Sequence, residues 1–179
     1  VWANGAVEFV DQTLLPQQEV MRRCDSVDLV IDAIVRLVVR GAPAIGVAGA
    51  YGVALAASKH DPVNDADKFR AEVKRIRDAR PTAVNLARMV DRAAVAKSFE
   101  EALRIADQVR EEERIASVNM GDLGADFLLE RCGDRPLRVM TICNTGALAA
   151  IERGTALAVI QTLHERGKLA EALPLETRP

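Results

Sequence analysis

The sequence predicts an α/β protein whose two parts differ in their hydrophobic spacing. From residue 25 to residue 127, apolar side chains recur every three or four positions, which is typical of amphipathic helices. After Pro136 the pattern becomes strand, helix and strand, which together form one βαβ unit. We therefore predict a mainly helical N-terminal domain with a short β start over residues 1–133, and the beginning of a parallel-sheet domain over residues 134–179.

The N-terminal part is expected to begin with a strand and to continue as helices. Residues 7–10 form the expected strand, which runs into a turn. The first helix is expected from Asp25 to Arg40, because apolar residues follow at helical spacing and Asp25 or Ser26 can cap the first amides. Gly41 then ends this helix.

The second helix is predicted over residues 44–57 and is apolar on every side. Gly46, Gly49 and Gly52 stand three positions apart, so one face lacks side chains and neighbouring elements can approach it closely. The apolar run of residues 42–57 is shorter than the roughly 20 residues that a membrane-spanning helix needs. It is therefore interpreted as a buried helix, and no membrane partner is expected.

Two further helices are expected after a polar connection at residues 59–65. The first is rich in charge and ends at Pro81. The second places Leu86, Val90 and Ala94 on its inward face.

A long helix follows the capping-box residues Ser98 and Glu101. Its expected inward stripe holds helical spacing over about seven turns. The stripe consists of Ala102, Ala106, Val109, Ala116, Met120, Leu123 and Phe127. A bend is expected near Gly121 or Gly124.

The C-terminal part is expected to form a strand, a loop, a helix and a second strand. These elements are predicted over residues 137–142, 143–146, 155–166 and 172–176. One βαβ unit cannot make a sheet that is covered on both faces. The chain is therefore expected to hold only the beginning of this second domain.

Composition argues against several functions. The formal net charge of -2 over 179 residues gives no strongly basic field for nucleic acid, and the 3% aromatic content offers few rings for stacking on bases. The three cysteines fit no zinc or CxxC spacing, and there are only two histidines. We therefore expect a cytoplasmic protein with no metal site and no nucleic-acid partner.

The first candidate site is the segment Arg40-Gly41-Ala42-Pro43. Glycine permits an unusual turn, proline favours a helix start, and a helix start presents unpaired N–H groups at the positive end of the helix dipole. With Arg40 beside it, this segment is suited to hold a phosphate. A plain corner between two helices explains the same residues, and on spacing alone it is the more frequent explanation.

A second arginine, Arg80, precedes Pro81 and Thr82. Proline keeps Arg80 out of the helical region, so its side chain points off a helix end and can fork onto phosphate oxygens. Judged alone, a solvated arginine at a helix C-terminus is the more frequent interpretation.

Cys143 is the candidate acid or nucleophile. It leaves the carboxyl end of a predicted strand in a loop with backbone donors, and such loops bind anions and lower the pKa of a thiol. Cys24 and Cys132 are interpreted as small buried hydrophobes, which is the common role of a free cysteine. A cysteine–histidine hydrolase is disfavoured, because one histidine lies in a polar loop and the other late in a helix.

Five separated blocks of the sequence carry a resemblance to a known family. They are Asp11-Gln12-x-Leu14-Leu15-Pro16; Arg40-Gly41-Ala42-Pro43-Ala44-Ile45-Gly46 with Ala50-Tyr51-Gly52-Val53-Ala54-Leu55-Ala56-Ala57; Arg80-Pro81-Thr82-Ala83-Val84-Asn85-Leu86; Thr141-x-Cys143-Asn144-Thr145-Gly146-Ala147-Leu148-Ala149 with Gly154-Thr155-Ala156-Leu157; and Glu176-Thr177-Arg178-Pro179. In order and spacing, these blocks closely resemble the methylthioribose-1-phosphate isomerase family.

This resemblance implies a helical N-terminal domain joined to a Rossmann-like C-terminal domain, usually as a homodimer. It implies an aldose–ketose isomerase of methionine salvage that converts 5-methylthioribose 1-phosphate to 5-methylthioribulose 1-phosphate. Arg40, Gly41, Ala42 and Arg80 would bind this sugar phosphate, chiefly through its phosphate, and Cys143 would be the catalytic thiol. No metal or organic cofactor is implied. Family members are about twice this length, so the C-terminal portion of the same enzyme, which carries a catalytic aspartate, is an expected partner.

Two departures from the family pattern and two alternative functions accompany the resemblance. Ile142 stands where a histidine is common, and residues 150–153 replace a smaller link that contains glycine. One alternative is a non-catalytic regulator like the related regulatory subunits of translation-initiation factor 2B, which lack the block at residues 143–146. The other alternative is an isomerase of ribose 1,5-bisphosphate.

Overall fold

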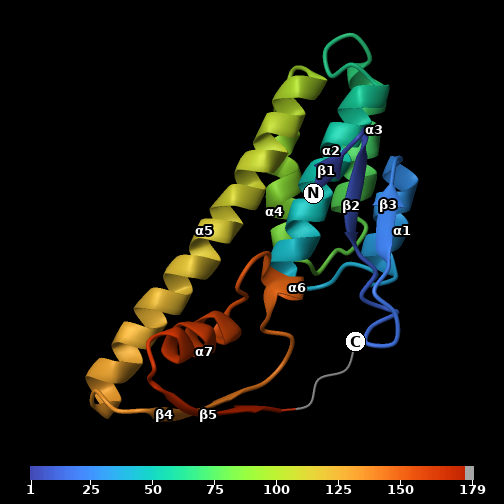
Figure 1. The fold of residues 1–179 in the computed structure, drawn as a ribbon. Coiled ribbons are helices and arrows are strands. Elements are labelled where there is room, and N and C mark those ends of the chain that lie inside the picture. Colours follow the sequence, from blue (N-terminus) through green and yellow to red (C-terminus); the bar gives the residue numbers. More distant parts are fainter. Residues whose placement is uncertain (176–179) are drawn as a thin grey trace. The chain divides into compact units, whose positions relative to one another are not determined.

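The computed structural model describes residues 1–175 and divides the chain into two compact units (Figure 1). The first unit is Val1–Glu111 and the second is Glu112–Pro179. The division falls within one long helix, α5 (Phe99–Cys132), so each unit builds part of its core from one half of that helix. The predicted domain boundary near residue 133 lies after this helix. It stays a prediction, because a helix shared by two units does not show where an independently folding domain ends.

The first unit opens with an antiparallel sheet of three strands, of which the sequence predicts only the middle one. They are β1 (Trp2–Ala3), β2 (Ala6–Val10) and β3 (Met21–Cys24), in the order β1-β2-β3. The turn between β1 and β2 is Asn4-Gly5, and both residues have positive φ, which is the geometry of a tight hairpin. β1 is too short to show a pattern, and β3 carries two adjacent arginines, so neither strand is visible in the sequence.

Five helices are predicted for the N-terminal part, and all five are present. They are α1 (Val27–Val35), α2 (Ala42–Lys59), α3 (Ala66–Arg77), α4 (Val84–Ala93) and α5. In α4, Leu86 and Val90 are buried as predicted, and Ala93 rather than Ala94 completes the buried face.

α1 ends at Val35, well before the predicted end at Arg40. Leu37 has a left-handed φ of 61°, which does not continue a right-handed helix. Val38 and Val39 are nevertheless buried. The apolar spacing predicts a longer helix, but its last residues are buried in a non-helical segment that leads to Arg40.

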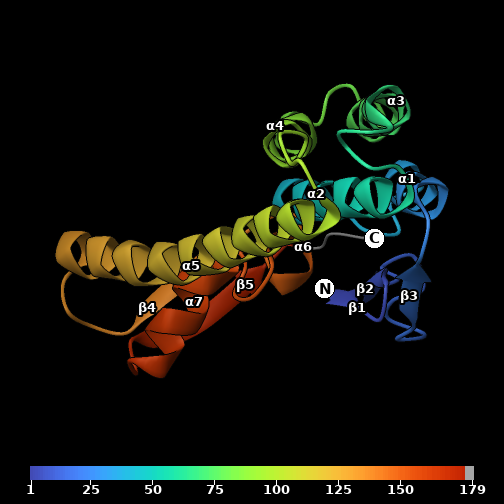
Figure 2. The same cartoon turned by 90° about the horizontal axis from the view of Figure 1, so that it is seen from above.

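α2 lies at the centre of the first unit, with α3 and α4 on one side and the β1–β3 sheet on the other (Figure 2). Its residues 44–57 are all buried. A Cβ added at Gly46 would lie 2.2 Å from Sδ of Met89, and one at Gly49 would lie 2.4 Å from Cδ1 of Leu86. The predicted close approach at the glycine face is confirmed, and the approaching helix is α4.

The two halves of α5 bury different faces. In the first half, Ala102, Ala106 and Val109 are buried as predicted. In the second half the predicted inward stripe is wrong, because its members lie on the exposed face. The exposed members are Ala116, Met120, Leu123 and Phe127.

The buried face in the second half of α5 carries small residues, among them Ser117, Gly121 and Ala125. A Cβ at Gly121 would lie 2.8 Å from Oγ1 of Thr162, on the helix α7 (Ala156–Glu165). Gly121 thus allows two helices to pack closely, and α5 continues as one helix through it.

The second unit contains the predicted βαβ arrangement. Its elements are the second half of α5, β4 (Leu137–Thr141), the short helix α6 (Ala147–Ala150), α7, and β5 (Leu169–Pro174). β4 and β5 pair in parallel, and Ala125, Leu137 and Leu163 form the centre of the core. The sequence does not predict α6, since four residues are too few to show helical spacing.

The last strand begins earlier than predicted, at Leu169 instead of Ala172. Gly167 has a positive φ that ends α7, so the chain can turn directly into the strand. Glu176, the predicted end of this strand, lies outside the described residues. Among the helices of residues 1–175, none combines the length and apolar character needed to cross a membrane.

Candidate functional site

The segment 40–43 enters α2 through a conformation that favours glycine. Gly41 precedes the helix with φ 99° and ψ 133°, and Pro43 lies in the first turn. Within the described part of the chain, no side chain caps this helix start. The first backbone N–H groups therefore have no partner inside the helix, and they lie at the positive end of its dipole, directly after Arg40.

Arg40 is held by Gln12, which follows β2. Nη2 of Arg40 donates a hydrogen bond to the main-chain oxygen of Gln12 at 2.8 Å, and Nε donates to Oε1 at 3.3 Å. Gln12 is itself buried, and its N–H donates to the oxygen of Val38 at 2.9 Å. Burial lowers the pKa of Arg40, although a guanidinium keeps its charge at neutral pH. The loop around Gln12 therefore fixes the position of a positive group.

The role of Gln12 is not visible in the sequence. Its neighbour Asp11 is buried too, and Oδ1 of Asp11 accepts hydrogen bonds from the N–H and Oγ1 of Thr13 at 3.0 and 2.5 Å. The sequence predicts a turn at these two polar residues and gives no sign that they are buried supports. The place of Gln12 in the first block of the family resemblance is the one signal that could have identified it.

Arg80 lies in the connection between α3 and α4 and is half-buried. The N–H of Ala83 donates to the main-chain oxygen of Arg80 at 2.9 Å, which closes a turn before α4. Over residues 1–175, the Arg80 guanidinium forms no hydrogen bond or ion pair. Unlike Arg40, it is not held by a partner among these residues.

Both arginine loops lie at one end of the first unit. α2 and α4 run in the same direction, so both helices begin at that end (Figure 1). The main-chain oxygen of Asn85, at the start of α4, lies 3.1 Å from the Cβ position of Gly46, near the start of α2. Two helix starts and two arginines at one end form an arrangement that is suited to bind an anion.

Cys143 follows β4 and is exposed. Its φ is 74°, a left-handed conformation that residues other than glycine adopt rarely and that is frequent at functional sites. The hydroxyls of Thr141 and Thr145, on either side of it, lie 3.4 Å apart. The loop thus presents the thiol at the carboxyl edge of the parallel sheet, where ligands bind in open α/β folds.

The loop of Cys143 is held through its backbone. The oxygen of Thr145 accepts hydrogen bonds from the N–H groups of Thr155 at 2.8 Å and Leu157 at 3.4 Å. Gly154 has a φ of 89°, and a Cβ there would lie 2.1 Å from the oxygen of Thr145. Only glycine fits this contact, so Gly154 is a second supporting residue that reasoning on the sequence missed.

The other two cysteines lie in different environments. Cys24 is buried, as predicted, and burial raises the pKa of its thiol. The prediction that Cys132 is buried is wrong, because Cys132 is the last residue of α5 and is exposed next to Gly133. Exposure therefore distinguishes Cys143 from Cys24 but not from Cys132.

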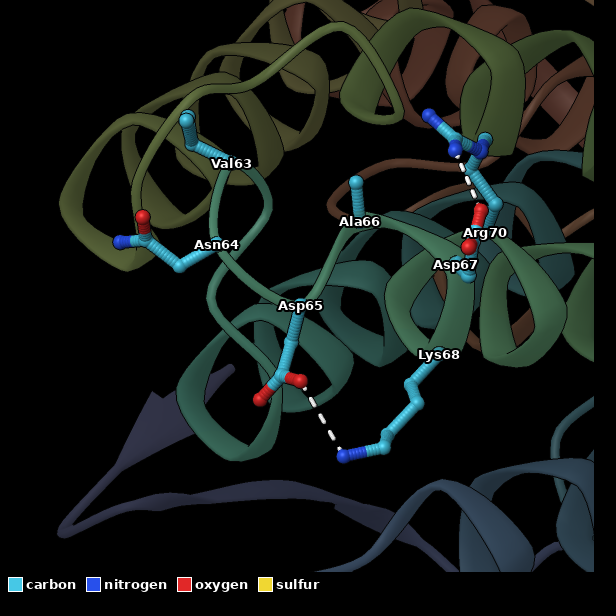
Figure 3. A pocket seen from close by; sticks show the side chains of 7 residues that line it. All are labelled: Val63, Asn64, Asp65, Ala66, Asp67, Lys68 and Arg70. Carbon is cyan, nitrogen blue, oxygen red and sulfur yellow. Dashed lines mark hydrogen bonds and ion pairs between the residues drawn. The ribbon is translucent and has the colours of Figure 1, made fainter.

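A shallow depression of about 310 Å³ lies at the connection between α2 and α3, lined by residues 63–68 and Arg70 (Figure 3). It is at the opposite end of α2 from Gly41. Its charged side chains pair with one another: Asp65 with Lys68 at 3.1 Å, and Asp67 with Arg70 at 2.6 Å. These exposed pairs leave no net charge to attract a ligand, and none of the predicted site residues lines the depression.

The predicted site residues divide between the two units. Arg40, Gly41, Ala42 and Arg80 belong to the first unit and Cys143 to the second, so their assembly into one site stays a prediction. Among residues 1–175, no group of three or more His, Cys, Asp or Glu side chains is arranged to hold a metal ion.

Two solved structures share this α/β architecture. The 5-methylthioribose 1-phosphate isomerase of Pyrococcus horikoshii matches with a TM-score of 0.84 and 29% identity, over 96% of this chain and 50% of that chain. The translation initiation factor eIF-2B subunit delta of Archaeoglobus fulgidus matches with a TM-score of 0.79 and 38% identity, over 100% of this chain and 54% of that chain. The fold is therefore one that is shared by proteins named as isomerases and as initiation-factor subunits.

Curated sequences give the same result. A probable bifunctional methylthioribose-1-phosphate isomerase/methylthioribulose-1-phosphate dehydratase of Nocardia farcinica is 45% identical over 99% of this chain and 33% of its own length. The methylthioribose-1-phosphate isomerase of Xanthomonas euvesicatoria is 41% identical over 100% of this chain and 52% of its own length. The chain thus spans about half, or less, of the length of these relatives. The model of the Initiation factor 2 subunit family matches residues 38–179, and the chain belongs to that family.

Proposed function

We propose that this chain acts in an aldose–ketose isomerase that converts 5-methylthioribose 1-phosphate to 5-methylthioribulose 1-phosphate in methionine salvage. Support comes from relatives named methylthioribose-1-phosphate isomerase that are 38–45% identical over nearly the whole chain. The observation that carries the proposal is the exposed thiol of Cys143, held in a left-handed loop at the carboxyl end of a parallel strand. A left-handed backbone at a residue other than glycine costs free energy, and such strain is found mostly where the position of a side chain serves a function.

The substrate's phosphate is assigned to the arginine end of the first unit. Arg40, Gly41 and Ala42 provide a fixed guanidinium and the free N–H groups of a helix start, and Arg80 provides a guanidinium without a partner among the described residues. Charge-assisted hydrogen bonds of this kind contribute about 1.5 to 3 kcal/mol each. They would fix one end of the sugar and leave its ring free to react.

The reaction needs an acid and a base. A phosphate ester at C1 prevents the sugar from opening as a free aldehyde, so the bond between C1 and the ring oxygen must break and hydrogen must move from C2 to C1. The ring oxygen gains a proton and the C2 hydroxyl loses one, which leaves a ketone at C2. Cys143 is assigned one of these proton transfers, and an aspartate from the C-terminal portion of the enzyme is assigned the other.

The proposed partners follow from assigning one catalytic group to this chain and the other to the C-terminal portion. The C-terminal portion of the same enzyme would continue the sheet of the second unit, and the assembled enzyme would be a cytoplasmic homodimer. Apolar residues at the open sheet support a covering partner, because Met140 is 63% exposed and Ile142 is 60% exposed.

A regulatory function of the initiation-factor kind is the second candidate, since one similar structure carries that name. Regulation of that kind needs a docking surface and no reactive thiol. The strained, exposed Cys143 therefore favours the isomerase.

The test uses the complete protein, meaning this chain together with its proposed C-terminal portion. It is incubated with 5-methylthioribose 1-phosphate and, separately, with ribose 1,5-bisphosphate, and the products are followed by phosphorus NMR. We expect conversion of the first compound alone. Conversion of neither would support the regulatory candidate, and conversion of the bisphosphate alone would support the other isomerase. Residues 1–179 by themselves should convert neither, because one of the two proton transfers is assigned to an aspartate of the C-terminal portion.

A further inference from the structure

Arg153 contacts two helices of the second unit, α5 and α7. Its backbone N–H donates to Oγ of Ser117 on α5 at 3.3 Å, and its Nη1 lies 3.4 Å from Oγ1 of Thr162 on α7. Its Nη2 also pairs with Glu165, at the end of α7. The Arg153 side chain is only 15% exposed, so these contacts are shielded from water more than those of an ordinary surface arginine.

The segment that Arg153 anchors carries an unfavourable backbone. Ile151 has a φ of 64°, which is an outlier for a β-branched residue, and Gly154 has a φ of 89°. Such conformations persist only where surrounding contacts hold them in place. Arg153 lies between the two positive-φ residues, and its side chain bonds to α7. A second pair, Glu152 with Arg114 at 3.3 Å, ties the same segment to α5.

This anchored segment is what the loop of Cys143 rests on. Gly154, the residue after Arg153, packs against the oxygen of Thr145 and against Gly146, with no space for a Cβ. The N–H of Thr155 then donates to the same oxygen of Thr145. A short covalent and hydrogen-bonded path therefore runs from the Arg153 guanidinium to the loop that bears the thiol.

We propose that Arg153 is a positioning residue for Cys143, acting through Gly154 and Thr145. None of its described contacts is with the thiol, and it sets the loop conformation by fixing the segment against α5 and α7. The proposal rests on the proposed function for the statement that the position of Cys143 matters to turnover. The mechanical part of the proposal is independent of that function.

Arg166 provides a matched control. It also bridges α7 and α5, through Asp122 at 3.1 Å and through Asp126 at 2.5 Å. It follows α7 and forms no hydrogen bond or ion pair with the segment 151–154 in the described contacts, although its partner Asp122 also acts electrostatically on Arg153. Removing Arg166 therefore weakens the same pair of helices and leaves every hydrogen bond and ion pair of Arg153 in place.

The experiment measures the Cys143 loop in the complete protein and its Arg153→Ala, Arg153→Lys and Arg166→Ala variants. Amide hydrogen exchange is followed at the N–H groups of Thr155 and Leu157, which donate to the oxygen of Thr145. In Arg153→Ala we expect exchange at these two amides to become faster by about tenfold or more, because the segment that carries them loses its anchor to α7. Arg153→Lys should restore part of the protection.

The same variants are then assayed for isomerisation. We expect Arg153→Ala to lower kcat by about tenfold or more, since misplacement by roughly 1 Å is enough for such a loss, with KM changed less than about threefold. Arg166→Ala should change neither quantity. Equal loss of amide protection in Arg166→Ala, or no loss in Arg153→Ala, would overturn the positioning role.

Failure of the positioning role and failure of the proposed function give different results. Faster exchange at Thr155 and Leu157 in Arg153→Ala with unchanged kcat would mean that Arg153 positions the loop but that Cys143 does not catalyse isomerisation. Unchanged exchange and kcat in Arg153→Ala, together with lost turnover in Cys143→Ala, would mean that Cys143 is catalytic and that Arg153 does not position it. If Arg153→Ala does not fold, Glu165→Gln removes the ion pair and keeps the arginine, and a smaller loss of amide protection is expected.

Discussion

The two candidate loops are held in place differently, one through a side chain and the other through its backbone. In residues 40–43, the charged side chain assigned to bind phosphate is itself a support, because Arg40 donates two hydrogen bonds to Gln12. In residues 141–146, the backbone is held by Gly154 and Thr155, and the side chain of Cys143 is left exposed. A loss of activity after substitution would therefore have a different explanation at each loop. We expect a substitution of Arg40 to affect binding and stability together, and a substitution of Cys143 to affect turnover alone.

The largest expected effect is on turnover in Cys143→Ala. Removing a group that transfers a proton in the transition state lowers kcat by about 10² to 10⁴-fold. The free energy of unfolding should change by less than about 0.5 kcal/mol, because the side chain is exposed and supports nothing. Steady-state kinetics and urea unfolding of the complete protein measure the two quantities.

Cys132→Ala is the control for that substitution, since Cys132 is also exposed but lies at the end of α5. It should leave both quantities unchanged. Turnover retained in Cys143→Ala would remove the thiol from the mechanism, and a large loss of stability would show that this side chain, too, is structural.

The second prediction concerns the backbone support of the Cys143 loop. Gly154→Ala places a Cβ 2.1 Å from the oxygen of Thr145 at a φ of 89°, whereas Gly167→Ala, also at positive φ, meets no atom within 4 Å. Gly167→Ala should cost about 1 kcal/mol of unfolding free energy for the strained φ, and Gly154→Ala should cost about 1 to 3 kcal/mol more for the clash. Equal losses in the two variants would show that the loop shifts freely and that its backbone is not tightly held.

The third prediction compares the two arginines. Arg40→Ala should raise KM by about ten- to one-hundredfold and also lower the free energy of unfolding by about 1 to 3 kcal/mol, because it leaves the buried Gln12 without its charged donor. Arg80→Ala should raise KM in a similar way but lower stability by less than about 0.5 kcal/mol. An unchanged KM in either variant would remove that arginine from the phosphate site.

Much of the fold could be predicted because the signals are local. The glycine spacing of residues 46–52 predicts the close approach to α2, and the change of period after Pro136 predicts the βαβ unit. The second half of α5 could not be predicted in the same way. It has two candidate faces, one of large apolar residues and one of small residues, and the helix buries the small one because close packing against α7 requires it. Hydrophobic spacing shows that a helix forms and does not show which face has a partner.

The site is predictable to a lesser extent for a related reason. The position of Cys143 follows from the end of a strand, and the positions of Arg40 and Arg80 follow from glycine and proline beside helix ends. The residues that hold these loops, Gln12 and Arg153, are polar residues that would ordinarily be exposed. Their partners come from segments distant in sequence, 28 positions away in the case of Gln12 and Arg40. Such support depends on tertiary contacts that no local pattern encodes.

The smallest expected effect is that of Tyr51→Phe, which should change the stability of the first unit without changing binding. Tyr51 of α2 is buried, and its hydroxyl donates to Oδ1 of Asp107 on α5 at 2.7 Å, at a place that carries no assigned ligand. Tyr51→Phe should therefore lower the free energy of unfolding by about 1 kcal/mol and leave KM unchanged. If KM rises as much as in Arg40→Ala, then general loosening of the first unit explains the arginine's effect on binding.

The stability of Tyr51→Phe should also depend on alkaline pH differently from that of the wild type. Burial and the hydrogen bond to Asp107 raise the pKa of Tyr51 above its ordinary value of 10.0. Below that pH the phenol is protonated in both the folded and the unfolded chain, so its contribution to stability is complete. Above it the unfolded chain loses the proton while the folded chain keeps it, which favours unfolding. Wild-type stability should therefore fall more steeply above pH 10 than that of Tyr51→Phe, and urea unfolding at a series of alkaline pH values measures the two slopes. Parallel slopes would show that the phenol ionises as readily in the folded chain as in the unfolded one, and that α2 and α5 are not held together by this hydrogen bond.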